Sequence, residues 1–263
     1  MKPASSSAAT ASGQLAGRIA LITGASRGIG AAVAVRFAAE GAHVVLAART
    51  VGGLEEVDDQ VRASGGSATL VPFDLREFIK IDELAAALYE RYGRLDILVG
   101  NAAEFGTFSP AGHIDPKLWG DIIELNLTAN WRLIRAMDPL LRAAPAGRAI
   151  FVTSRLARDA LPYYGPYAVA KAGLETLVRI YAGEVARTAV RANLIDPGIV
   201  RTRLRATIFP GEDPADLPGP ESVAHSFLEL ALPECTRNGE IVTLASAAPH
   251  PVPLPAGGAR ERS

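Results

Sequence analysis

The sequence has one cysteine, Cys235, and almost no excess of charge of either sign. A single cysteine excludes an intrachain disulfide and argues against a cysteine-based zinc site, so we expect no metal. The 27 basic and 28 acidic side chains leave a net charge of −1, which argues against a nucleic-acid partner or a polybasic membrane patch. No stretch of 18 consecutive apolar residues is present, so we expect neither a membrane-spanning helix nor a membrane partner.

The two ends of the chain lack the patterns of folded elements. Residues 1–14 are small and polar with no apolar segment, which predicts a disordered leader rather than a secretory signal. Residues 246–263 are rich in proline and include Gly257-Gly258, which predicts a disordered tail. No shift of composition divides residues 15–245, so we expect one domain there and a cytoplasmic location.

Short apolar runs alternate with helical periodicity throughout residues 15–245. We predict strands at about 18–23, 43–48, 68–73, 95–99, 148–153, 191–195 and 240–244. We predict helices at about 28–40, 54–64, 81–91, 115–141, 167–187 and 221–232. This order predicts an α/β fold, a single-domain Rossmann-type, doubly wound parallel sheet of about seven strands with helices on both faces. The proline-rich residues 203–219 break the rhythm and predict a long loop of the kind that serves as a lid.

A glycine-rich turn joins the first predicted strand to the first helix, with the sequence Thr23-Gly-Ala-Ser-Arg-Gly-Ile-Gly30. Gly24 permits a tight turn, Gly28 lets a pyrophosphate approach the backbone, and Gly30 lets the helix pack closely on the strand. The free N–H groups at the start of the helix attract phosphate charge. At this place in the chain the pattern predicts a dinucleotide site.

The same residues also match G-x-S-x-G, the nucleophile elbow of α/β-hydrolases, with Ser26 as the nucleophile. In the hydrolase fold that elbow follows several strands, whereas here only one strand precedes it. None of the four histidines lies in a context that ties it to an acid. We therefore reject the hydrolase interpretation.

The choice of nucleotide depends on the end of the second strand. A carboxylate there would bind the ribose 2′-hydroxyl of NAD(H), but the sequence is Leu46-Ala-Ala-Arg49-Thr50. The Arg49 guanidinium can fork onto a 2′-phosphate, and Arg27 in the glycine turn could reach the same place. We therefore expect NADP(H) in preference to NAD(H), with the alternative that both arginines are merely solvated.

A second group of polar residues points to proton transfer. Tyr167 and Lys171 are four residues apart on one predicted helix and so share a face. A nearby ammonium would favour the phenolate and lower the pKa of Tyr167. Ser154 follows a predicted strand, and in a doubly wound sheet it would lie with these two side chains near the carboxyl edge, where ligands bind.

With this set the chain resembles the short-chain dehydrogenase/reductase family in its single-domain branch. The resemblance rests on the glycine turn, Asn101-Ala102, Asn126, Ser154, Tyr167-x-x-x-Lys171 and Pro197-Gly198, which occur in the family's order and spacing over about residues 15–245. It implies that Tyr167 is the general acid/base, that Lys171 lowers its pKa and holds the nicotinamide ribose, and that Ser154 binds the substrate oxygen. It also implies that Asn126 holds a water in a proton relay.

The resemblance also implies a cofactor site. Asp74 would bind the adenine, Asn101 would steady the central sheet and the cofactor, and Thr202 with the backbone near Pro197-Gly198 would hold the nicotinamide amide. The candidate cofactor-binding residues are Gly24, Ser26, Arg27, Gly28, Ile29, Gly30, Arg49, Asp74, Leu75, Asn101, Ala102, Tyr167, Lys171, Pro197, Gly198, Val200 and Thr202.

The chain departs from the family's pattern in four places. Gly100 and Ala103 stand where the family usually has asparagine and glycine, Asp196 stands where a small residue is commoner, and the segment after Leu244 lacks the usual paired glycines. We expect altered affinity rather than lost activity from the first two. The substrate would lie against residues 104–113, 155–164 and 203–219. Arg155 and Arg158 in the second of these segments could bind an acidic substrate, although exposed arginines in such positions are more often solvated.

The expected function is therefore NADP(H)-dependent interconversion of a carbonyl and a secondary alcohol, with a small-molecule substrate. Three alternatives stay open: an NAD(H)-dependent dehydrogenase of the same family, a nucleotide-binding regulator without turnover, and an isomerase or epimerase that uses the nicotinamide transiently. The family commonly pairs its long helices, so a homodimer or homotetramer is expected. Apolar positions such as Leu125, Trp131 and Leu174 would permit such contacts.

Overall fold

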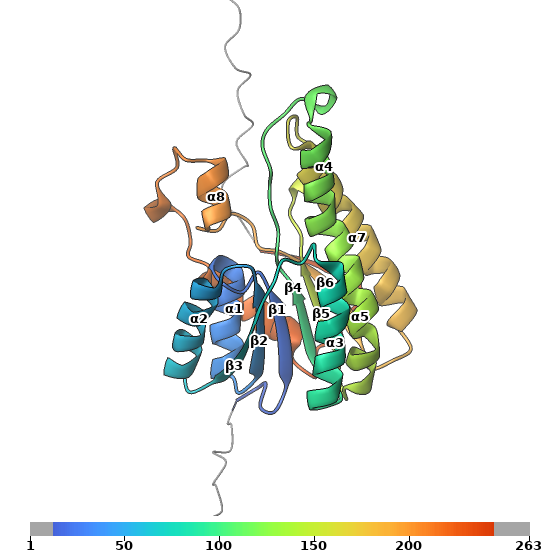
Figure 1. Cartoon of the computed structure of the whole chain (residues 1–263). Coiled ribbons are helices and arrows are strands. Elements are labelled where there is room, and N and C mark those ends of the chain that lie inside the picture. The colour runs from blue at the N-terminus through green and yellow to red at the C-terminus, as the bar shows by residue number, and fades with distance from the viewer. Residues whose placement is uncertain (1–12, 245–263) are drawn as a thin grey trace, which may run out of the picture.

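The protein is described from a computed structural model, which covers residues 13–244. Within that range seven strands form one parallel sheet in the order β3-β2-β1-β4-β5-β6-β7 (Figure 1). The strands are β1 (Ile19–Thr23), β2 (His43–Ala48), β3 (Ser67–Pro72), β4 (Ile97–Gly100), β5 (Arg148–Val152), β6 (Arg191–Asp196) and β7 (Ile241–Thr243). The order reverses between β1 and β4, which is the switch point where such sheets bind ligands. The predicted fold class and strand number are confirmed.

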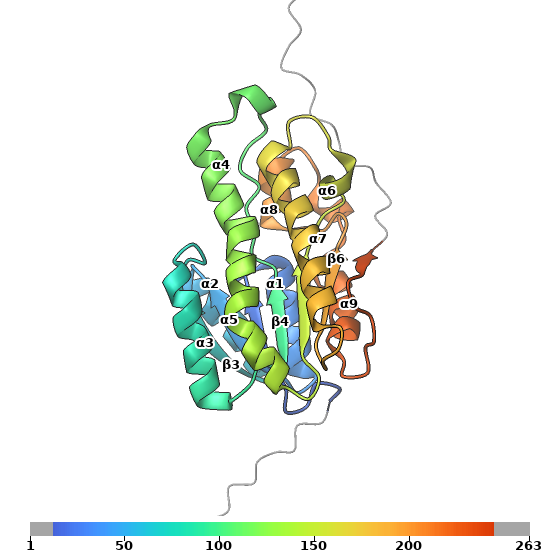
Figure 2. The ribbon, with the colours of Figure 1, turned by 90° about the vertical axis from the view of Figure 1, so that its right-hand side faces the viewer.

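Helices cover both faces of the sheet. One face carries α1 (Gly28–Ala39), α2 (Val51–Ala63) and α9 (Glu221–Ala231), and the other carries α3 (Phe78–Tyr92), α5 (Ala129–Ala143) and α7 (Gly165–Val185). Figure 2 looks onto the second of these layers. Two large apolar clusters result, one on each side of the sheet, because the strands are apolar on both faces. In β1, for example, Leu21 belongs to one cluster and Ile22 to the other, and neither is exposed.

The remaining helices lie toward the carboxyl edge of the sheet. They are α4 (Pro116–Ile123), α6 (Leu156–Asp159), α8 (Arg203–Ile208) and the short 3₁₀ turns at Ala111–His113 and Pro214–Asp216. Helix α4 begins as the sequence predicts, because Asp115 is its N-cap and accepts a hydrogen bond of 2.9 Å from the Leu118 backbone N–H. In Figure 1, α8 lies at the top of the molecule on the side opposite α4.

Three expectations need correction. Residues 203–219 are not one loop, since they include α8 and a 3₁₀ turn. The predicted helix over 115–141 is not uniform, because a π-helical segment, Glu124–Thr128, separates α4 from α5. Leu125 and Leu174 are buried inside the protomer, so of the three apolar positions considered for subunit contacts only Trp131, which is 43% exposed, is available.

Two other expectations concern the ends and membranes. The predicted leader, apart from residues 13 and 14, and the predicted tail lie outside the described residues. No helix within residues 13–244 combines the length and apolar character needed to cross a bilayer.

Candidate active site

A cleft of about 620 Å³ runs along the carboxyl ends of the strands. Its walls come from the turn after β1, the loops after β2 to β6, the first turns of α7 and the segment that holds α8. The predicted site residues that line it are Gly24, Ser26, Arg27, Gly28, Ile29, Arg49, Asp74, Leu75, Asn101, Ala102, Ser154, Tyr167, Lys171, Pro197, Gly198, Val200 and Thr202. Gly30 and Asn126 do not line the cleft. Gly30 packs against the back of the glycine turn, and Asn126 is hydrogen-bonded to the backbone of Glu104.

The glycine turn after β1 has the shape that its sequence predicts. Gly24 and Gly28 have φ of +65° and +56°, which L side chains rarely adopt. Gly30 faces the back of the turn, where an added Cβ would lie 2.4 Å from the Gly24 carbonyl oxygen and 2.7 Å from Asn101 Nδ2. The helix can therefore pack against the strand only with glycine at this position.

Asn101 ties the glycine turn to the centre of the sheet. Its Nδ2 donates to the Thr23 carbonyl oxygen at 2.9 Å, and its backbone N–H donates to Thr23 Oγ1 at 2.9 Å. Thr23 Oγ1 also accepts from the Ala102 N–H at 3.2 Å. These contacts agree with the sheet-steadying position that the resemblance implies for Asn101.

Tyr167, Lys171 and Ser154 come together at the wall of the cleft. Tyr167 and Lys171 lie in the first two turns of α7 and are 8% and 1% exposed. Lys171 Nζ lies 5.7 Å from the centre of the Tyr167 ring and donates to the Val152 carbonyl oxygen at 2.7 Å. Ser154, just beyond β5, is hydrogen-bonded to the Tyr167 side chain.

The pKa shifts of Tyr167 and Lys171 differ from those expected from the sequence. Burial is the largest effect and raises the pKa of Tyr167, Asp196 acts in the same direction, and the hydrogen bond to Ser154 opposes them. Burial also lowers the pKa of Lys171 to about 8. The expected lowering of the Tyr167 pKa by a neighbouring ammonium is therefore not found, because removal from water penalises the charged forms of both side chains and Lys171 is not among the causes of the Tyr167 shift.

Asn126 lies in the π-helical segment between α4 and α5 and is fully buried. Its Oδ1 accepts from the Glu104 backbone N–H at 3.0 Å, and its Nδ2 donates to the Glu104 carbonyl oxygen at 2.8 Å. Its own carbonyl oxygen accepts from Asn130 Nδ2 at 2.8 Å. The side-chain amide thus fixes the backbone of the loop after β4, a contact that the sequence did not indicate.

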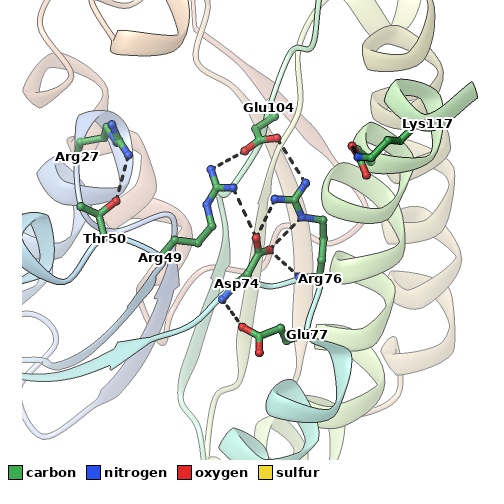
Figure 3. Close-up of polar contacts among 9 residues, drawn as sticks. Arg27, Arg49, Thr50, Asp74, Arg76, Glu77, Glu104 and Lys117 are labelled. Carbon is green, nitrogen blue, oxygen red and sulfur yellow. Dashed lines mark hydrogen bonds and ion pairs between the residues drawn. The ribbon is translucent and has the colours of Figure 1, made fainter. Parts of the chain in front are cut away.

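Four charged side chains, Arg49, Asp74, Arg76 and Glu104, form one ion-pair group (Figure 3), and all of them except Arg76 line the cleft. Arg49, after β2, lies 2.5 Å from Glu104 and 3.5 Å from Asp74. Arg76 binds both oxygens of Asp74 at 3.1 and 2.8 Å and lies 3.8 Å from Glu104. The hydrogen bond from the Arg76 guanidinium is the largest cause that lowers the pKa of Asp74. Arg27 lies beside this group, with its Nη2 at 3.5 Å from Thr50 Oγ1.

A second charged cluster lies beneath the loop after β5. Arg158 donates to Asp196 Oδ2 at 2.6 Å and to Glu175 Oε1 at 2.9 Å. The carboxylates of Asp196 and Glu175 are 3% and 7% exposed, and Thr153 Oγ1 also donates to Glu175 at 2.8 Å. Arg158 therefore balances two internal carboxylates, which corrects the suggestion that it binds an acidic substrate. Arg155 pairs with Asp159 of its own helix at 2.7 Å.

Aromatic side chains gather around Tyr167, and Phe105, Tyr164 and Phe209 among them line the cleft. The ring of Phe105 lies 5.5 Å from the rings of Tyr164 and Tyr167, and Phe108 lies 5.1 Å from Tyr164 and 5.9 Å from Phe209. Leu156 is buried in the same cluster, and Leu204 and Ile208 of α8 pack against it. Tyr167 thus belongs to a buried cluster of aromatic and aliphatic side chains. Phe105 and Phe108 lie in residues 104–113, a segment that was expected to contact the substrate.

The residues present fit a dinucleotide. The cleft joins the glycine turn, whose conformation leaves room for a phosphate beside the backbone, to Tyr167 at one end and to the guanidinium of Arg49 at the other. A nucleotide-binding turn, a switch-point cleft and a Ser-Tyr-Lys set on one sheet edge define a nicotinamide-dependent oxidoreductase of the Rossmann type.

Comparison with known proteins agrees with this class. The family model for short chain dehydrogenases matches residues 18–213. YciK of Escherichia coli strain K12, an uncharacterized oxidoreductase, is 33% identical over 216 residues, which cover 81% of this chain and 85% of YciK. The chain therefore belongs to the short-chain dehydrogenase/reductase family and is an oxidoreductase.

Solved structures show the same relationship. A proposed short-chain dehydrogenase from Pseudomonas syringae superposes with a TM-score of 0.85 at 36% identity, over 88% of this chain and 95% of that one. A protein from Escherichia coli CFT073, solved in complex with NADPH, has a TM-score of 0.83 at 32% identity, over 88% of this chain and 97% of that one.

Proposed function

We propose that the protein reduces ketones to secondary alcohols, and catalyses the reverse oxidation, with NADP(H) as cofactor. The observation that carries the proposal is the meeting of Ser154, Tyr167 and Lys171 in the cleft that also holds the glycine turn. NADPH, when bound, supplies the hydride. The chain's own residues bind and orient the substrate and supply the proton.

Tyr167 is the proton donor in the reduction. Its pKa is raised by burial, so the phenol keeps its proton at neutral pH, which is the form that a carbonyl oxygen requires. Ser154 donates a hydrogen bond to the same oxygen and holds it beside the phenol. In the reverse direction the alcohol proton returns to Tyr167, and a cationic Lys171 would favour the phenolate.

The aromatic wall favours a bulky apolar substrate. Phe105, Tyr164 and Phe209 present rings to the space beside Tyr167, and Arg158 is held by internal carboxylates. We therefore propose ketones with an aromatic or alicyclic substituent, for which ring contacts and exclusion of water supply binding energy.

The nucleotide preference rests on Arg49, since no carboxylate ends β2 and a guanidinium forks onto phosphate. The NADPH complex of a relative that is 32% identical supports the same choice. The Arg49→Ala variant should lose about 10-fold or more in affinity for NADPH and little for NADH. A wild-type protein that prefers NADH, with a preference unchanged in Arg49→Ala, would exclude NADP(H) as the cofactor.

The Tyr167→Phe variant tests the chemistry. Because phenylalanine keeps the ring but has no proton to give, turnover should fall by at least about 10³-fold. Affinity for NADPH, measured by quenching of protein fluorescence, should change less than about 3-fold. The activity assay follows NADPH absorbance with a panel of aryl and alicyclic ketones. A Tyr167→Phe protein with near wild-type turnover would refute the proposed proton donor.

A further inference from the structure

Glu104 holds the arginine that the proposed function assigns to the 2′-phosphate. We propose that Glu104 is a specificity determinant for the nucleotide: it competes with the 2′-phosphate for Arg49 and lowers the affinity for NADPH relative to NADH. This inference rests on the proposed role of Arg49. It concerns a residue outside the family motifs that the sequence identified.

The position of Glu104 is unusual for a partner of Arg49. Glu104 follows β4, whereas Arg49 follows β2, and β1 lies between those strands in the sheet. The Glu104 side chain therefore reaches over the end of β1, and its carboxylate lies between the two arginines, with one oxygen 2.5 Å from Arg49 and the other 3.8 Å from Arg76 (Figure 3). Arg49, Asp74 and Glu104 all line the cleft.

The group formed by Arg49, Arg76, Asp74 and Glu104 has no net charge. Arg49 and Arg76 carry two positive charges, and Asp74 and Glu104 carry two negative ones. Asp74 is already bound by two nitrogen atoms of Arg76 and lies 3.5 Å from Arg49, whereas Glu104 makes the closest contact to Arg49. A phosphate that approaches Arg49 competes with the Glu104 carboxylate for the guanidinium and is repelled by the carboxylate charge. NADH, which carries a 2′-hydroxyl, meets no such charge repulsion.

Hydrogen bonds to the backbone of Glu104 hold its side chain close to Arg49. Its N–H and carbonyl oxygen are both bound by the side chain of the buried Asn126, at 3.0 and 2.8 Å. The loop is therefore held at this distance from Arg49, and the carboxylate can leave only by rotation of its own side chain. Arg76, at 3.8 Å, offers it a second partner in the same group.

The test is the Glu104→Gln variant, titrated with NADPH and with NADH by fluorescence in the absence of substrate. Removal of one negative charge at about 6 Å from a phosphate in a water-rich site should strengthen NADPH binding about 5- to 20-fold. NADH binding should change less than about 3-fold. Adenosine 2′,5′-bisphosphate and AMP, titrated by calorimetry, should show the same difference and thereby locate it at the 2′-phosphate.

Two further variants separate the possible outcomes. Glu77→Gln removes the same charge from a neighbour of Asp74 that is paired with Lys80 rather than Arg49, and it should change the NADPH-to-NADH ratio less than about 2-fold. In an Arg49→Ala background, Glu104→Gln should have little effect on that ratio, because the guanidinium for which Glu104 and the 2′-phosphate compete has been removed.

The inference is tested by comparing the NADPH-to-NADH affinity ratio of each variant with that of the wild type, and the comparison does not depend on which cofactor the wild type prefers. An unchanged ratio in Glu104→Gln, or weaker NADPH binding, overturns the role of Glu104. If Arg49→Ala still lowers NADPH affinity in that case, the proposed cofactor site stands without this inference. If Arg49→Ala leaves NADPH affinity unchanged, the cofactor assignment and the inference fail together.

Discussion

Replacement of Lys171 by methionine should stabilise the protein in the absence of cofactor while removing a residue of the active site. Lys171 is 1% exposed, and burial lowers its pKa from 10.5 to about 8. The folded state at neutral pH therefore contains an ammonium group that is costly to bury. Each pKa unit corresponds to about 1.4 kcal/mol, so the shift corresponds to about 3 kcal/mol.

Part of this gain is lost with the hydrogen bond from Nζ to the Val152 carbonyl oxygen, which is 2.7 Å long. An unsatisfied buried carbonyl costs about 1–3 kcal/mol, and methionine keeps most of the apolar contacts of the lysine stem. We therefore expect Lys171→Met to be about 1–2 kcal/mol more stable than wild type at pH 7. Reversible urea unfolding, followed by circular dichroism, measures this difference.

The pH dependence provides the sharper test. Between pH 8 and 10.5 the unfolded chain binds more protons at Lys171 than the folded protein does, so wild-type stability rises with pH in this window. Lys171→Met has no such group, so its stability relative to wild type should fall by about 3 kcal/mol across the window, and above pH 10.5 the variant should be the less stable protein by about 1–2 kcal/mol. Burial also raises the pKa of Tyr167 and Tyr181, but Lys171 is not a cause of either shift. Both tyrosines remain in the variant, so their effects should cancel in the difference. A variant that is less stable at pH 7, with a difference that does not vary with pH, would refute the reasoning.

Two predictions concern Gly100 and the ion-pair partner of Asp196, since both Gly100 and Asp196 are departures from the family's pattern. An added Cβ at Gly100 would lie 2.3 Å from Phe151 Cδ1 and 2.6 Å from Asn130 Oδ1, so Gly100→Asn should lower the free energy of unfolding by about 1–3 kcal/mol. The control is Gly52→Asn, where an added Cβ meets no described atom within 4 Å; equal losses in the two variants would contradict the packing argument. Arg158→Met leaves the buried carboxylates of Asp196 and Glu175 without their guanidinium partner. Because Arg158 is itself 37% exposed, the free energy of unfolding in urea should fall by only about 2–3 kcal/mol. The control Arg155→Met removes an exposed pair within one helix and should cost less than about 0.5 kcal/mol; a comparable loss there would argue against a special role for the buried cluster.

The fold could be predicted from local patterns because each element of this sheet carries its own signal. The apolar runs of β1 and β2 are buried on both faces and end at residues that the sequence itself marks, such as Gly24. The start of α4 was predictable because an N-cap aspartate followed by proline acts through its own next residues. The π-helical segment at Glu124–Thr128 and helix α8 were missed. Both make contacts that no local pattern indicates: Asn126 is hydrogen-bonded to the backbone of Glu104, and Leu204 and Ile208 of α8 pack against the aromatic cluster.

The sequence could predict which side chains meet in the cleft, but it could not predict their pKa shifts or ion-pair partners. Motif spacing placed Ser154, Tyr167 and Lys171 together, yet the shifts of their pKa depend on how far the folded chain excludes water. The sequence likewise offered Arg49 and Arg158 as free guanidiniums for ligands, and the structure pairs both with carboxylates from other strands or helices. Arg49 and Glu104 are 55 positions apart, so no local pattern links them. A charged residue near a predicted cleft can therefore be assigned to a ligand only after its partners within the protein are known, and Glu104 is the partner that here decides how much of the Arg49 charge a nucleotide can use.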